Sequence, residues 1–111
     1  MAQLNVFKST LYTFDTNDEV IYTAPGGYTA IILNAQCANI TDNDVTVTFK
    51  ITDEAANTQN ELISELTIPS HDAANLATGK LVVTSGNKLR GYASANTALK
   101  LTLSYLESLD A

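Results

Sequence analysis

The sequence predicts an all-β fold: one domain over residues 1–111, built as an antiparallel two-sheet β-sandwich of about eight strands. Apolar and polar residues alternate with a period of two, as expected for strands with one buried face. Clusters of Asn, Asp, Gly and Ser separate these runs at intervals of roughly 8–12 residues. No stretch keeps a helical period. A jelly roll and an immunoglobulin-like sandwich both fit, and the strand count with a long third strand favours the jelly roll.

The first half of the chain contains four predicted strands, each followed by a turn. We expect them at residues 3–10 (with 12–14 as an extension), 19–24, 28–40 and 45–52. Pro25 cannot donate to a strand ladder and Gly26–Gly27 tolerates positive φ, so the chain turns there in what the spacing predicts to be a hairpin. The third strand is apolar on both faces at 31–33, which favours a central position. In the fourth, Val45, Val47, Phe49 and Ile51 are expected to face inward.

The second half contains the other four predicted strands. We expect them at residues 61–68, 80–84, 89–95 and 99–106. Residues 53–60 form a polar loop, and residues 71–78 form either a short helical turn or a loop that crosses between the sheets. Ser85–Gly86–Asn87 predicts a second hairpin turn. The last strand places Leu99, Leu101, Leu103 and Tyr105 on one face.

Composition and charge exclude several classes of function. The net charge is −6, and the six Lys and Arg residues are dispersed, so the footprint of a nucleic-acid-binding protein is absent. The acidity also repels anionic membranes, and no apolar run approaches the roughly 20 residues of a membrane span. We expect no secretion signal. Cys37 is the one cysteine, so no internal disulfide forms, and we expect a small buried hydrophobe there.

Catalytic constellations are not expected, and no cofactor is predicted. The single imidazole lies in Ser70–His71–Asp72, where three consecutive residues have the wrong geometry for a triad that converges from distant parts of a chain. The carboxylates of Asp42 and Asp44 suit a turn. Asp42–Asn43–Asp44 also resembles the opening of a calcium loop, but the required glycine is missing at its sixth position. We therefore predict no metal site, with a weak surface calcium site as the open alternative.

Two groups of residues are candidates for binding. Tyr22 and Tyr28 flank the Pro–Gly–Gly turn, where they either stack on a ligand such as a glycan or pack the end of the sandwich. Apolar residues near the two termini are candidate assembly contacts, with completion of the core as the alternative. These residues are Leu4, Val6, Phe7, Leu106 and Leu109.

The order of motifs over residues 17–107 resembles a family of small β-sandwich virion structural proteins of tailed bacteriophages. The resemblance is carried by IYTAPGGYTA at 21–30, the strand ending ANI at 38–40, the alternating strand at 45–52, IP at 68–69, GKLVV at 79–83, GNKL at 86–89, YASA at 92–95 and SYLE at 104–107. Two positions depart from the family pattern. Gly27 stands where a different small residue is more common, and Asn87 where Asp is frequent.

The resemblance implies a non-enzymatic structural subunit of a phage particle. Within this role we favour a capsid decoration (cement) protein that stabilises the head shell; a neck, connector or tail-associated ring or fibre subunit is the alternative. Independently of the resemblance, a carbohydrate-binding or host-adhesion module that uses Tyr22 and Tyr28 is the second alternative. The implied partners are the major capsid protein or neck and tail proteins, in a homo-oligomer with a trimer favoured, without nucleic acid or membrane. Such a protein is made in the host cytoplasm and located in the virion.

Overall fold

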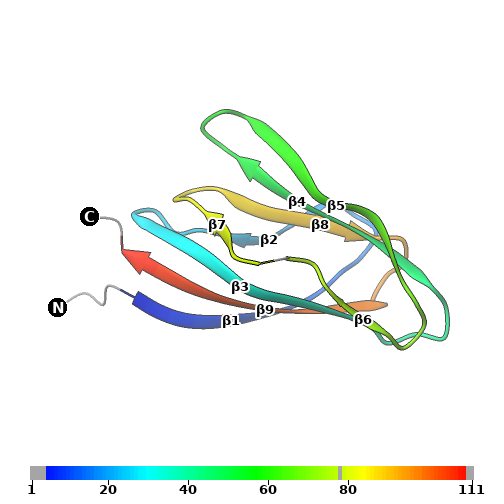
Figure 1. Cartoon of the computed structure of the whole chain (residues 1–111). Coiled ribbons are helices and arrows are strands. Elements are labelled where there is room, and N and C mark those ends of the chain that lie inside the picture. Colours follow the sequence, from blue (N-terminus) through cyan, green and yellow to red (C-terminus); the bar gives the residue numbers. More distant parts are fainter. Residues whose placement is uncertain (1–4, 78, 110–111) are drawn as a thin grey trace.

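The computed structural model describes residues 5–77 and 79–109, and within them all regular structure is β-strand. Two antiparallel sheets face each other in an elongated sandwich of 48 × 28 × 21 Å (Figure 1). The nine strands are β1 (Asn5–Thr13), β2 (Glu19–Thr23), β3 (Tyr28–Asn39), β4 (Val45–Asp53), β5 (Thr58–Ile68), β6 (Ala73–Asn75), β7 (Leu81–Val83), β8 (Lys88–Ala93) and β9 (Leu99–Leu109).

The strand order is that of a jelly roll. Sheet A has the order β1-β9-β3-β6, with β7 also paired to β3, and sheet B has the order β2-β8-β4-β5. β6 and β7 pair with different parts of β3, at Cys37↔Ala74 and Ile31↔Val82, and so form one interrupted edge strand. Counting them as one gives eight strands in the orders 1-8-3-6 and 2-7-4-5, the two interlocked Greek keys of a jelly roll. The predicted β-sandwich is confirmed.

The two predicted hairpin turns connect different sheets, and the hairpin prediction is wrong at both. The turn at 25–27 leads from β2 in sheet B to β3 in sheet A, and the turn at 84–87 leads back from β7 to β8. The two turns lie against each other: Gly27 N donates to Ser85 Oγ, and Gly86 N donates to Ala24 O, both at 3.0 Å. Gly27 and Gly86 have φ values of 83° and 84°, which fit glycine at both corners.

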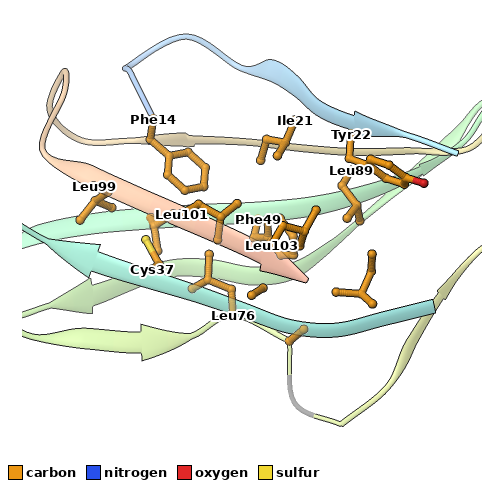
Figure 2. Close-up of a cluster of buried hydrophobic side chains, with 14 of the residues drawn as sticks. Phe14, Ile21, Tyr22, Cys37, Phe49, Leu76, Leu89, Leu99, Leu101 and Leu103 are labelled. Atoms are coloured by element: carbon orange, nitrogen blue, oxygen red, sulfur yellow. The ribbon is translucent and has the colours of Figure 1, made fainter. Parts of the chain in front are cut away.

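The core fills the space between the two sheets (Figure 2). In β4, the inward positions Val45, Val47 and Phe49 are at most 3% exposed, as the alternation predicts. The largest fully buried side chains are Phe14, Phe49, Ile32, Ile68, Leu89, Leu99, Leu101 and Leu103. Phe14 comes from the segment between β1 and β2 and covers one end of this core, with its ring edge-to-face against Tyr12 at a centroid distance of 5.2 Å.

Several element bounds differ from the predicted ones. β1 continues to Thr13, while residues 3 and 4 lie outside the described residues. β5 begins at Thr58, within the predicted polar loop, because the end of β4 pairs with it directly through Asp53↔Thr58. Residues 71–77 contain the short strand β6 and no helical turn, and β9 extends to Leu109 because β1 and β3 both pair along its length.

Cys37 lies in β3 with its side chain in the core, fully buried (Figure 2). Burial raises the pKa of the Cys37 thiol to about 12. Because the thiolate is the reactive form, we expect the native protein not to react with a thiol reagent at pH 8. The full equivalent should react once denaturant opens the core. Rapid labelling without denaturant would contradict this placement.

Candidate interaction surface

Four apolar side chains form one row across the outer face of sheet A. Phe7 of β1 is opposite Leu106 of β9, Leu106 is opposite Ile31 of β3, and Ile31 is opposite Val82 of β7. Directly opposed residues in antiparallel strands point to the same face, so these residues form a continuous apolar row. Both ends of the apolar row are open to solvent: Phe7 is 76% exposed and Val82 is 52% exposed.

Leu33 extends the apolar row on the side where Ser9 and Ser104 lie. It lies in the irregularity of β3 between Ile32 and Asn34 and is 40% exposed. A shallow groove beside it is lined by Phe7, Lys8, Ser9, Leu33, Ser104 and Tyr105. The bulge therefore gives β3 an additional outward-facing apolar residue next to the apolar row.

Apart from Leu11, which is 78% exposed, and Lys100, the rest of this face carries hydroxyl, amide and small side chains. At the other outward positions of the described strands, the residues are Asn5, Ser9, Leu11 and Thr13 on β1, Lys100, Thr102, Ser104 and Ser108 on β9, Thr29, Asn34, Gln36 and Ala38 on β3, and Ala73 and Asn75 on β6. Lys100 is the one ionisable residue among these described outward positions. A chain with 12 acidic residues thus presents a face whose strands carry none of them outward.

The outer face of sheet B is charged instead. Lys50 of β4 is opposite Arg90 of β8, and both contact Asp18, with Lys50 Nζ 2.6 Å from Asp18 Oδ2. Lys88 Nζ pairs with the Glu54 carboxylate. These interactions hold the long side chains flat on the sheet, and as a result Lys50 is only 9% exposed although it faces outward.

Two grooves on sheet B are polar. One is lined by Asp18, Thr52, Thr58, Gln59 and Arg90 among others, and the other by Thr16, Thr48, Glu65, Tyr92 and Ser94 among others. The Lys50 ammonium lies 5.5 Å from the centroid of the Tyr92 ring, so a cation already covers one face of this aromatic. The grooves present hydrogen-bonding groups without a free aromatic platform.

A buried carboxylate ties the two sheets together at the end where β1 begins and β9 ends. Glu107 of β9 is 5% exposed and accepts a hydrogen bond from the Tyr22 hydroxyl of β2. Lys8 Nζ of β1 lies 2.8 Å from the other carboxylate oxygen. Burial alone raises the pKa of Glu107, but Lys8 and Tyr22 outweigh it and hold the pKa below its ordinary value.

Acid is expected to weaken the fold through these carboxylates. Glu107 and Asp18 both have a pKa below the ordinary value. For Asp18, burial raises the pKa, but the neighbouring Lys50 ammonium outweighs burial and lowers it. A lowered folded-state pKa favours the ionised folded form, so this stability is fully present above the unfolded-state pKa. It is lost as pH falls below roughly 4.5 and through the folded-state values. Thermal unfolding between pH 7 and pH 2.5 should show a falling midpoint; a constant midpoint would contradict it.

The candidate assembly residues separate onto two sides of sheet A. Phe7 and Leu106 face outward in the apolar row. Val6, opposite Glu107, and Leu109, opposite Tyr28, lie on the inner side at the end of the sandwich and are partly buried. Leu4 lies outside the described residues. Ile31 and Val82 were not among the candidates, because their outward direction depends on pairing between distant strands.

The two candidate ligand-facing tyrosines do not form a platform. Tyr22 is 8% exposed and packs against the Tyr105 ring, with centroids 4.5 Å apart (Figure 2 shows Tyr22 within the core cluster). Tyr28 is partly exposed at the start of β3. The structure thus places Tyr22 in packing, the alternative that the sequence left open, with its ring unavailable for stacking on a glycan.

The remaining polar candidates serve loop structure. His71 Nε2 lies 2.6 Å from Asp42 Oδ1, with both side chains exposed. Asp44 Oδ1 accepts a hydrogen bond from the Ser70 backbone amide. In the described part of the chain, no three His, Cys, Asp or Glu side chains come together in a way that would hold a metal ion. No helix there is long and apolar enough to cross a membrane.

Comparisons with known proteins find similar folds. A scan against protein-family models and a search of curated sequences gave no match. Among solved structures, a chain from Bacillus endospore appendages, a family of disulfide-linked pili, aligns with a TM-score of 0.57 and 10% identity over 97% of this chain and 88% of that chain. A chain from the acid-stable capsid of the Helicobacter pylori bacteriophage KHP30 aligns with a TM-score of 0.55 and 13% identity over 100% of this chain and 92% of that chain. Both similarities concern the fold.

Proposed function

We propose that this protein is a non-enzymatic structural subunit of a tailed-phage particle, and specifically a decoration protein on the outside of the head shell. The observation that carries the proposal is the alignment of the whole chain with a capsid chain of nearly the same length. Such a small subunit needs a surface through which it attaches to neighbours. The apolar row on sheet A, open at both ends, supplies a surface of this kind.

The buried thiol favours the phage role over a pilus role. Pili that are linked by disulfides need cysteines that meet across subunits. Cys37 is the one cysteine in this sequence, and it is fully buried in β3. A disulfide to another copy would require the core to open, so the covalent linkage of the pilus family does not transfer to this chain.

The available side chains support a non-enzymatic role. Burial raises the pKa of the Cys37 thiol to about 12, which makes it a poor nucleophile. The His71 imidazole contacts the exposed Asp42 carboxylate, and in the described part of the chain no hydroxyl or thiol nucleophile is hydrogen-bonded to it. The two similar structures described above come from a capsid and from pili, which agrees with a role in assembly.

Immunogold electron microscopy of purified particles tests the proposal. Antibodies against the purified chain should label the head shell of particles from the source culture, and quantitative mass spectrometry should find many copies per particle. Label at one vertex or along the tail would replace decoration by the neck, connector or tail alternative. Absence of the chain from purified particles would overturn the virion role.

A glycan array probed with the purified protein tests the carbohydrate-binding alternative. No observation in the structure favours that alternative, since Tyr22 is buried and Lys50 covers one face of Tyr92. We expect no binding above background. Specific binding that is lost in Tyr28→Ala would move the assignment to an adhesion module.

A further inference from the structure

We propose that the outer face of sheet A joins two copies of this chain face to face, with the apolar row of one copy packed on the apolar row of the other. The inference rests on the proposed function, because a decoration subunit must assemble. It goes further by naming the surface and its occupant. Charge, symmetry and the size of the face each favour a second copy of this chain as the occupant.

The charge distribution favours a second copy as the occupant. Each copy has a net charge of −6, so two copies repel each other wherever carboxylates face carboxylates. The outer face of sheet A is the exception, because its described outward strand positions carry Lys100 and no carboxylate. A basic partner would instead be drawn to acidic surface, which this face lacks.

The geometry of the apolar row is self-complementary. Its four side chains come from four neighbouring strands and lie at one level, from Phe7 at the β1 edge to Val82 at the β7 edge. A two-fold axis that lies in the interface places the apolar row of one copy on the apolar row of the other, so that both ends of each row are covered. A three-fold arrangement brings unlike surfaces together and leaves part of the row in water. The structure therefore favours a pair over the trimer expected from the resemblance.

The face is large enough for a specific contact. β9 has 11 residues, which gives a length of about 36 Å, and four strands give a width of about 19 Å. Because the fourth strand consists only of β6 and β7, with three residues each, the face offers about 600 Å² per copy. Twist removes part of this area from contact, and a pair that buries more than about 1,000 Å² in total still qualifies as a specific interface. We expect a reversible dimer that is stabilised by dense packing in an assembly.

Sedimentation velocity over a concentration series tests the pair. The wild-type mass should rise from one chain to two with concentration, and the dissociation constant should fall as salt screens the net charge. Val82→Asp, at one end of the apolar row, should raise the dissociation constant at least tenfold. Phe7→Asp, at the opposite end, should do the same, and because Phe7 is 76% exposed, this substitution removes little packing from the fold. Circular dichroism and thermal unfolding verify the fold of each variant.

Val20→Asp is the matched control. Val20 is 39% exposed on β2 in sheet B and lies opposite Arg90, so the substitution adds the same charge away from the apolar row. Its dissociation constant should stay within about twofold of wild type. Three outcomes overturn the pair: a monomer at every concentration, a mass of three chains, or a dimer that Val82→Asp and Phe7→Asp leave intact.

Failure of this inference and failure of the proposed function give different results. A chain that is monomeric in solution but labels the head shell refutes the pair and keeps the virion role, and the shell protein then becomes the occupant of the row. A chain that dimerises through the apolar row but is absent from particles keeps the pair and refutes the virion role.

Discussion

Gly91→Ala is expected to destabilise the fold by about 3 kcal/mol, the upper range for overpacking a core. Gly91 lies inward on β8, and a Cβ built there would be 2.6 Å from the backbone oxygen of Thr48 and 3.0 Å from Cε1 of Phe14. The Thr48 oxygen belongs to the neighbouring strand β4, so it moves only if the ladder between β4 and β8 opens. The fully buried Phe14 ring would have to shift as well.

Urea unfolding of Gly91→Ala beside Gly26→Ala separates crowding from the general effect of adding a methyl group. Nothing lies within 4 Å of a Cβ at Gly26, whose φ is not positive, so this control should change the free energy of unfolding by less than about 0.5 kcal/mol. Equal midpoints for the two variants would show that the space above Gly91 is not filled as the structure has it.

The fold class was predictable because one face of most strands is buried. In β4, Val45, Val47 and Phe49 alternate with polar residues, which predicts that these three side chains face the core, and the structure confirms their burial. The last strand follows the same rule, with Leu99, Leu101 and Leu103 buried. These signals are local, so the sequence shows them without knowledge of which strand pairs with which.

Strand pairing was not predictable in the same way. The turns at 25–27 and 84–87 have the composition of hairpin turns, yet each leads to the opposite sheet. Glycine lowers the cost of any sharp turn and does not specify whether the next strand pairs or crosses over. What decides is the non-local ladder, in which β3 pairs with β9 and β2 pairs with β8.

The apolar row shows the same limit at the candidate site. The sequence predicts Phe7 and Leu106 as assembly contacts because they are apolar and lie near the termini. Ile31 and Val82 lie within longer apolar runs, and nothing in the sequence distinguishes them from core residues. The row exists only because three separate registers place these four residues at one level. A surface that runs across strands leaves no periodic signal along the chain.

Tyr22→Phe is expected to cost about 2 kcal/mol of stability. The variant removes only the hydroxyl that donates to Glu107 and keeps the ring contact with Tyr105. Hydrogen bonds to charged groups contribute about 1.5–3 kcal/mol, and a buried carboxylate that loses a donor is left incompletely satisfied. The pKa of Glu107 should rise towards its ordinary value in the variant, and the stability gained between acid and neutral pH should shrink accordingly.

Tyr12→Phe is the matched control, because the Tyr12 hydroxyl also donates to a carboxylate, Glu19, but at an exposed site. Water replaces that hydrogen bond, so the loss should stay below about 0.5 kcal/mol. Unfolding of both variants at pH 7 and pH 3 separates the buried clamp from the loss of a hydroxyl in general. Equal losses at pH 7, or an unchanged pH dependence in Tyr22→Phe, would mean that Lys8 alone satisfies Glu107. The two sheets would then be held at this end by apolar packing without a polar clamp.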